Sequence, residues 1–282
     1  MKFILIILLF FASLQASSVR VMTYNLLNFS NENEREGDFI DIIEYIEPDV
    51  IIAQELIGQT GFSNFKSDVL DIISPEAWSA APFTNQTAQQ DIGLYYRSDN
   101  FDILGTNIIY SAQSSGTRDV IEWSMEHIQS GVNFTVYGVH FKASSGSSNA
   151  QERAEEATIL REYLNNLPEG SYFIVGGDFN IYSNSSSSEP AFDILTQVMD
   201  DNDGQLFDPI DRIGHWHNNS SYADVHTQSP RTSSFGGGAP GGMDDRFDWL
   251  FISQRLLDQS SSMYYIEDTY WAFGNDGNHF ND

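Results

Sequence analysis

The chain alternates between two hydrophobic patterns, one typical of strands and one typical of helices. Residues 19–26 alternate apolar and polar side chains, as a half-buried strand does. Residues 31–47 and 151–167 instead carry apolar side chains at a helical spacing, and the first of these segments stops before Pro48. Further strands are expected at residues 49–54, 93–97, 101–110, 120–128, 133–141, 172–177 and 247–252. Because strands and helices interleave and no repeat or linker divides the chain, we expect a single α/β domain.

The first eighteen residues form a separate unit. Lys2 precedes an apolar run from Phe3 to Ala12, and small or polar residues follow as far as Ser18. This order is typical of a cleavable signal peptide. The apolar run is about half of the ~20 residues that a membrane-spanning helix needs. We therefore expect a signal peptide at residues 1–18, a catalytic domain at residues 19–282 with no transmembrane segment, and a secreted or periplasmic protein.

Composition excludes several classes of function. The chain has 282 residues, with 13 Lys and Arg against 40 Asp and Glu, and its formal net charge is −27. Such a surface disfavours a stable complex with nucleic acid, which needs many cationic contacts to phosphate. The chain has no cysteine, which excludes disulfides, thiol nucleophiles and cysteine-based zinc sites. The hydrophobic fraction of 41% is ordinary for a globular domain, and we expect a monomer.

Polar side chains gather where the expected strands end. Asn25 ends the first strand, Glu55 follows the second, and Asp178 and Asn180 follow the strand at residues 172–177. Ligand sites in α/β sheets collect at such ends. Carboxylate and amide oxygens are the ligands that Mg²⁺ prefers, and Asn25 with Glu55 offers that combination. Asp178 and Asn180 stand two residues apart, so both can face one reacting group, although each residue taken alone is more often a turn or a cap.

Two further positions carry candidate chemistry. His140 ends a strand beside Lys142, where it can donate to a phosphate oxygen or a leaving group. Asp248 enters an otherwise apolar strand and can fix the tautomer of a histidine base. The plainer alternatives are a surface histidine for His140 and a surface ion pair between Arg246 and Asp248.

Five short motifs in this order resemble the endonuclease/exonuclease/phosphatase superfamily. They are T-Y-N-L at residues 23–26, Q-E at 54–55, V-H-F-K at 139–142, G-D-F-N at 177–180 and R-F-D-W at 246–249. The resemblance implies a deoxyribonuclease I-like fold. This is a four-layer α-β-β-α sandwich with two mixed β-sheets face to face. It also implies hydrolysis of phosphoester bonds with Mg²⁺ or Mn²⁺, and Ca²⁺ is a further candidate as a structural ion.

The resemblance also implies roles for individual residues. Asn25 and Glu55 correspond to metal ligands. Asp178 and Asn180 correspond to the pair that orients the nucleophilic water and the scissile phosphate. His140 corresponds to a phosphate-contacting or acid histidine, and Asp248 corresponds to the carboxylate that orients the catalytic histidine.

The C-terminal residues depart from the family pattern, which ends in S-D-H and one more apolar strand. Here Asn278 precedes His279, and three residues remain after His279. One interpretation makes His279 the general base, with Asn278 in place of the aspartate. The other, which we favour, is that the final strand and the true motif are missing from this sequence.

The substrate is less constrained than the fold. Arg118 and Arg153 are candidates for contacts to phosphate, and residues 215–242, with His226 and Arg231, are expected to form a surface loop beside the site. The expected function is an exported endonuclease with DNA or RNA as a transient substrate. The alternatives are a sphingomyelinase-like lipid phosphodiesterase, a phosphatase of small esters, or a non-catalytic relic.

Overall fold

A computed structural model describes residues 17–30, 34–86, 88, 90–184, 188–278 and 280–281. The expected signal peptide lies almost entirely outside these residues, and so does His279. Among the described residues, no helix is both long enough and apolar enough to cross a membrane.

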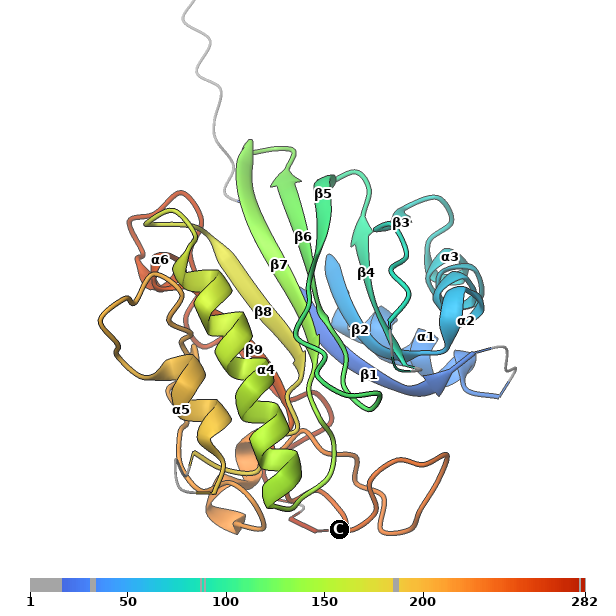
Figure 1. Cartoon of the computed structure of the whole chain (residues 1–282). Coiled ribbons are helices and arrows are strands. Elements are labelled where there is room, and N and C mark those ends of the chain that lie inside the picture. The colour runs from blue at the N-terminus through green and yellow to red at the C-terminus, as the bar shows by residue number, and fades with distance from the viewer. Residues whose placement is uncertain are drawn as a thin grey trace, which may run out of the picture.

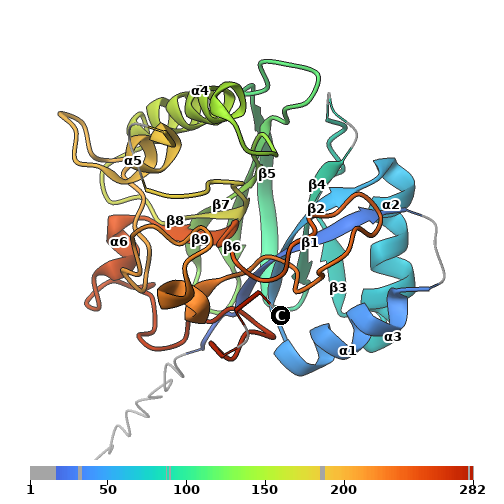
Figure 2. The ribbon, with the colours of Figure 1, turned by 90° about the horizontal axis from the view of Figure 1, so that it is seen from below.

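Two mixed β-sheets form the centre of the molecule (Figures 1 and 2). The four-stranded sheet has the order β1-β2-β4-β3, and the five-stranded sheet has the order β5-β6-β7-β8-β9. The strands of the first sheet are β1 (Val21–Phe29), β2 (Val50–Leu56), β3 (Trp78–Ala80) and β4 (Asp91–Arg97). The strands of the second sheet are β5 (Phe101–Ile109), β6 (Val120–His127), β7 (Val132–His140), β8 (Phe173–Asp178) and β9 (Asp248–Ile252).

Helices cover the outer face of each sheet, which confirms the four-layer α/β sandwich (Figure 2). The four-stranded sheet is covered by α1 (Glu36–Ile46), α2 (Gly58–Phe65) and α3 (Asp71–Ile73), with a π-helical turn at Lys66–Leu70 between the last two. The five-stranded sheet is covered by α4 (Ser147–Asn165) and α5 (Pro190–Thr196). A 3-10 helix at Ser220–Val225 and the short helix α6 (Gln254–Leu257) lie among the C-terminal segments.

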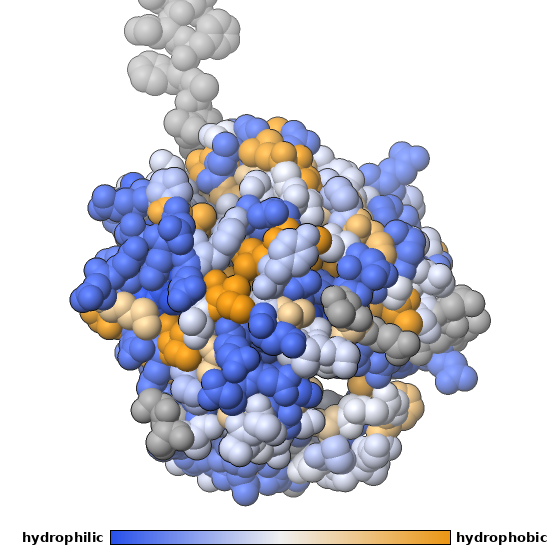
Figure 3. All heavy atoms as spheres, in the orientation of Figure 1, coloured by the Kyte–Doolittle hydropathy of each residue, from blue (hydrophilic) through white to orange (hydrophobic). Residues whose placement is uncertain are grey.

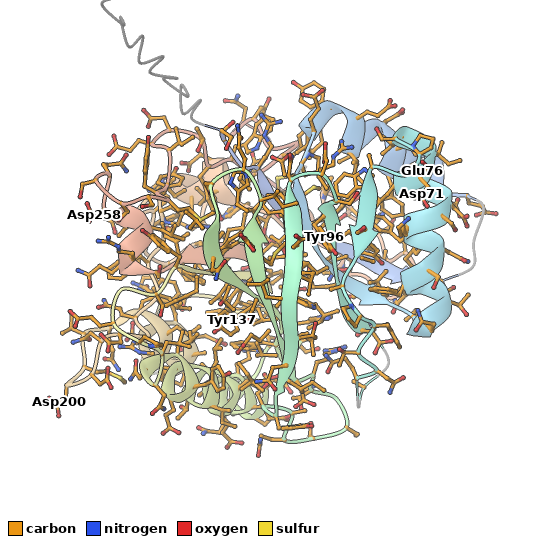
Figure 4. The ribbon with its side chains drawn as sticks, turned by 90° about the horizontal axis from the view of Figure 1, so that it is seen from above. Asp71, Glu76, Tyr96, Tyr137, Asp200 and Asp258 are labelled. Carbon is orange, nitrogen blue, oxygen red and sulfur yellow. The ribbon has the colours of Figure 1, made fainter. Side chains whose placement is uncertain are left out.

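Alternation along the strands builds the apolar layers. In β2, Ile51 and Ala53 pack toward the helices α1 and α2, whereas Val50 and Ile52 face the other sheet. The third layer lies between the five-stranded sheet and helices α4 and α5. Two tyrosines labelled in Figure 4 belong to different apolar layers. Tyr96 packs with the cluster between the sheets, and Tyr137 packs with the cluster under α4.

Most expected elements are present within a few residues, and the missed ones are short or irregular. The segment from α2 to α3 was missed because its glycines and its π-helical turn interrupt the helical period. Strand β3 has three residues and α5 has seven, so neither gives a clear period. Within the predicted loop at residues 215–242, the structure places a short 3-10 helix. The described residues after β9 add no strand to either sheet, and the missing final strand stays a prediction.

The negative charge is spread over the surface. Hydrophilic side chains cover most of the face seen in Figure 3, and apolar ones form small patches between them. In Figure 4, the carboxylates of Glu76, Asp200 and Asp258 lie at separate points on the periphery. These three carboxylates are therefore distributed over the surface and do not form one acidic patch.

Candidate active site

Five strands bring all six predicted site residues together, four of them at or next to a strand end and Asn25 in the middle of β1, where its register with β2 shifts. Asn25 and Glu55 come from β1 and β2 of one sheet, and His140, Asp178 and Asp248 come from β7, β8 and β9 of the other. Asp178 lies opposite both His140 and Asp248 in the strand register. Asn180 follows β8, and its backbone N–H donates to Asp178 Oδ1 over 3.0 Å. The site therefore exists only where the two sheets face each other.

Local irregularities of the backbone orient the side chains of Glu55 and Asn180 toward the site. The register of β2 shifts between Ala53 and Leu56, and Glu55 adopts a left-handed conformation with φ of 61°. Asn180 is also left-handed, with φ of 52°. This conformation costs about 1–3 kcal/mol for residues other than glycine and is concentrated at functional sites. The bulge breaks the strict alternation of β2 and allows Glu55 to reach across to the other sheet.

The amide of Asn25 bridges two carboxylates. Its Nδ2 donates to Glu55 Oε1 over 3.0 Å and to Asp178 Oδ2 over 3.1 Å. Its Oδ1 accepts from the backbone N–H of Leu27. Glu55 Oε2 accepts from the N–H of Asn28 and from the side chain of Gln90. Partial positive charges of N–H groups thus surround the carboxylate of Glu55.

His140 faces the same two carboxylates. Its Nε2 lies 3.8 Å from Asp178 Oδ2 and 4.0 Å from Glu55 Oε1. Burial, together with the nearby Arg118, lowers the pKa of His140 well below its usual value, so the neutral imidazole is favoured. Its Nδ1 is buried and has no hydrogen-bond partner among the described residues.

The buried carboxyl groups of Asp178 and Asp248 both have raised pKa values. Burial is the largest cause that raises the pKa of Asp178, and Glu55 adds repulsion. The pKa of Asp248 is raised well above its usual value by burial and by the charges of Asp178 and Glu55. The Oδ1 of Asp248 is buried without a partner in the described part of the chain. Arg118, which donates to the side-chain oxygen of Gln90, is the cation whose charge acts on both Glu55 and Asp178.

The chemistry of this donor set fits a hard divalent cation. Glu55 and Asp178 present carboxylate oxygens on either side of one amide NH₂, and their raised negative potential would be relieved by a cation. Asn25 fits less directly, because its oxygen accepts from Leu27 and would have to turn to act as a ligand. Among the described residues, no three histidine or acidic side chains form a group that could enclose a metal ion.

Arg153 was wrongly predicted to contact phosphate. Arg153 lies on α4, and its fully buried side chain forms an ion pair with Glu189 and donates to the backbone oxygens of Lys142 and Ser144. Arg153 therefore anchors the loop that follows His140. Sequence alone shows the charge of an arginine but not its burial.

Two other expectations also change. The alternative of an ion pair between Arg246 and Asp248 is wrong, because the buried Arg246 pairs with Asp208 over 2.8 Å. His226, in the predicted loop, is buried, and its Nε2 lies 2.8 Å from the backbone oxygen of Trp216.

The predicted loop at residues 215–242 does lie beside the site. Asn28 at the end of β1 donates to the backbone oxygen of Gly236, and the loop crosses beneath β1 in Figure 1.

The sequence analysis missed one histidine–aspartate pair. His217 Nδ1 lies 2.9 and 3.0 Å from the two carboxylate oxygens of Asp245. The two residues are separated by 27 others in the chain, so no local motif joins them. The only available signal was the position of Asp245 just before the R-F-D-W motif.

The site lies in a large open groove. Its volume is about 2600 Å³. All six predicted site residues line it, together with other residues of β1 and the loop at residues 227–231. His217, Tyr182 and Asp245 line the same groove.

Fold and motifs together define a class of phosphoester hydrolases. The profile of the Endonuclease/Exonuclease/phosphatase family matches residues 22–270, and the chain belongs to this family. Family members hydrolyse phosphoester bonds. No curated protein matches the sequence significantly.

Solved structures with the same fold come from several kinds of protein. A mannosyl-6-phosphatase of Bacteroides thetaiotaomicron VPI-5482 has a TM-score of 0.59 and 17% identity, over 84% of this chain and 86% of that one. D. rerio TDP2 complexed with single-strand DNA product has a TM-score of 0.58 and 16% identity, over 83% of both chains. The human Nocturnin catalytic domain with bound sulfate has a TM-score of 0.55 and 16% identity, over 84% of this chain and 83% of that one. These similarities establish the fold.

Proposed function

We propose that the protein is an exported, divalent-metal-dependent endonuclease that hydrolyses phosphodiester bonds of DNA or RNA. The observation that carries the proposal is the convergence of Asn25, Glu55, His140, Asp178 and Asn180 at one edge of the paired sheets. The proposed location rests on the N-terminal sequence pattern alone.

Each residue has a proposed role in the reaction. Glu55 and Asn25 would hold Mg²⁺ or Mn²⁺, which would supply charge neutralisation at the phosphate. Asp178 accepts the proton of the attacking water, because burial raises its pKa to about 7 and makes it a stronger base than an exposed carboxylate. Asn180 orients the phosphate, and neutral His140 donates from Nε2 to a phosphate oxygen. Asp248 would orient a histidine base, and the described residues contain no histidine that pairs with it.

The shape of the groove supports a polymeric substrate. A volume of about 2600 Å³ far exceeds the need of a small ester, for which pockets of about 300–1,000 Å³ are usual. Arg118 lies beside the carboxylates and provides a positive charge for phosphate. The overall charge of −27 favours brief contacts and rapid release of an anionic polymer. Nucleic acid is therefore proposed as a transient substrate of a monomer.

The test is nicking of supercoiled plasmid by the purified protein in Mg²⁺ or Mn²⁺. We expect cleavage that EDTA abolishes and that Asp178→Asn lowers at least about 100-fold, because a positioned acid or base contributes on this scale. Asp200→Asn is the matched control. Asp200 is exposed at the periphery, and its substitution removes the same charge as Asp178→Asn does. Full cleavage by Asp178→Asn would contradict the assignment. If plasmid and RNA stay intact while a small phosphate ester or a lipid is hydrolysed, the alternatives of a phosphatase or a lipid phosphodiesterase would be favoured instead.

A further inference from the structure

The pair formed by His217 and Asp245 is built as a fixed hydrogen-bonding group. Asp245 is buried, with 4% of its side chain exposed, and both of its carboxylate oxygens lie within 3.0 Å of His217 Nδ1. The side chain of His217 is 52% exposed. A buried carboxylate therefore holds a half-exposed imidazole ring in one orientation.

The backbone on both sides of His217 is anchored. The preceding Trp216 is fully buried, and its Nε1 donates to the backbone oxygen of Ile181. The N–H of the following Asn218 donates to the backbone oxygen of Asp244. Because both neighbours are fixed, the exposure of His217 is not that of a mobile loop side chain. The ring is held at the wall of the groove before any ligand arrives.

Tyr182 connects this pair to the candidate active site. Its ring packs edge-on against His217, with 5.3 Å between ring centroids, and against Phe247, with 5.0 Å. The charges of both Asp245 and Asp178 act on the hydroxyl of Tyr182, whose pKa is raised to about 12 chiefly by burial. Tyr182, His217 and Asp178 line the same groove. Among the described residues, His217 pairs with Asp245 and forms no ion pair with Glu55, Asp178 or Asp248.

The carboxylate of Asp245 determines which nitrogen of His217 is left for a ligand. Nδ1 lies against both oxygens of Asp245, and Nε2 has no partner among the described residues. An imidazolium Nε2–H is a donor, and an anionic phosphate oxygen is its complement.

We propose that His217, held by Asp245, binds a second phosphate of the substrate, adjacent to the phosphate that is cleaved. This inference rests on the proposed function and narrows the substrate class to esters that carry at least two phosphates along one strand. A strand lying in the groove would place its scissile phosphate at Asp178 and its next phosphate beyond Tyr182. His217 then determines specificity and takes no part in bond cleavage.

The experiment compares two nucleotides that differ by one phosphate. Binding of thymidine 5′-monophosphate and of thymidine 3′,5′-bisphosphate is measured by calorimetry in Mg²⁺, in the Asp178→Asn background so that no turnover occurs. We expect the bisphosphate to bind about tenfold more tightly than the monophosphate, because one hydrogen bond to a charged group increases affinity by about this factor. His217→Gln should remove this advantage and leave the monophosphate unchanged. Asp245→Asn should remove part of it, because the ring loses its ionised partner.

His215→Gln is the matched control, since His215 is exposed two residues away and does not line the groove. The His215→Gln variant should still bind the bisphosphate about tenfold more tightly than the monophosphate. The inference is overturned if the two nucleotides bind equally, if neither binds, or if His217→Gln retains the difference or weakens both nucleotides alike. A bisphosphate advantage that depends on His217, in a protein that leaves plasmid and RNA intact, would refute the proposed nuclease function and support the phosphate site.

Discussion

Glu156 is a fully buried carboxyl group on α4 with a single hydrogen-bond donor. The backbone N–H of Lys142 donates to its Oε2 over 2.8 Å, and its Oε1 has no partner among the described residues. Burial raises the pKa of Glu156 from 4.5 to about 8, against the opposing effects of Lys142, Arg118 and Arg153. The native protein therefore holds a proton here that the unfolded chain releases near its ordinary pKa.

This proton makes stability depend on pH. Between about pH 4.5 and pH 8 the native state binds more protons than the unfolded state, so the contribution of Glu156 falls as pH rises. Glu156→Gln mimics the protonated form and lacks this dependence. We expect the variant and the unmodified protein to have similar free energies of unfolding near pH 5. Toward pH 8, the free energy of unfolding of the variant should rise relative to that of the unmodified protein by up to about 1.4 kcal/mol per pH unit, measured by urea denaturation.

Glu155→Gln serves as the control for that experiment, because Glu155 is exposed on the same helix. Its difference from the unmodified protein should stay constant with pH. A constant difference for Glu156→Gln as well would show that Glu156 is ionised in the native state.

At the residue scale, sequence was informative where motifs were local. Asp178 and Asn180 are two positions apart, and their proximity follows from the chain itself. The burial of Arg153 and the pairing of His217 with Asp245 depend on tertiary packing, which no local pattern encodes. Asn25 and Glu55 were expected as metal ligands from their ligand chemistry and from the family resemblance, and the structure places Asn25 Nδ2 3.0 Å from Glu55 Oε1.

At the element scale, Gly176 of β8 packs tightly against the other sheet. A Cβ atom there would lie 2.4 Å from Ile52 Cδ1 and 2.8 Å from Leu250 Cδ2. Real side chains avoid such distances, so β8 lies this close to β2 only because residue 176 has no side chain. Asp178 is two residues further along β8, and Glu55 is three residues beyond Ile52.

Gly176→Ala should therefore push the sheets apart. We expect a loss of about 1–3 kcal/mol in the free energy of unfolding, as overpacked cores show. Ile52→Val removes the atom that would clash, so the double variant Gly176→Ala/Ile52→Val should recover part of the loss. Thermal or urea denaturation of all four proteins gives the coupling energy. Strictly additive effects would argue against the contact.

The same element scale shows what periodicity can predict. The long strands and the helices α1 and α4 were expected because each repeats its pattern over several turns or residue pairs. The segment from α2 to α3 was not expected, since a π-helical turn shifts the apolar positions out of register. The expectation of two facing mixed sheets came from the family resemblance, and the order of strands within them was not predicted, because alternation alone does not specify which strands pair.

At the scale of the whole molecule, the net charge of −27 opposes folding. Carboxylates spread over the surface repel one another more in the compact state than in the expanded chain. Dissolved salt screens this repulsion, with a Debye length of about 10 Å at 0.1 M. The protein should therefore be more stable in saline solution than in dilute buffer.

We expect the Tm at pH 7 to rise by several degrees between about 10 mM and 0.5 M NaCl, because this range removes most long-range repulsion. The same titration near pH 4 should change the Tm much less, since many carboxylates are then protonated. Differential scanning calorimetry at both pH values provides the comparison. An equal increase at both pH values would point to an effect of salt other than charge screening.

The candidate site joins parts of the chain that are made at different times. Asn25 and Glu55 belong to the first sheet, whereas Asp178 and Asp248 enter with the last strands of the second. Domains fold as the chain leaves the ribosome, N-terminal parts first. A partly synthesised chain thus presents one half of the carboxylate cluster without the other. For a phosphoester hydrolase built in this way, the carboxylate cluster is complete only when both sheets have formed.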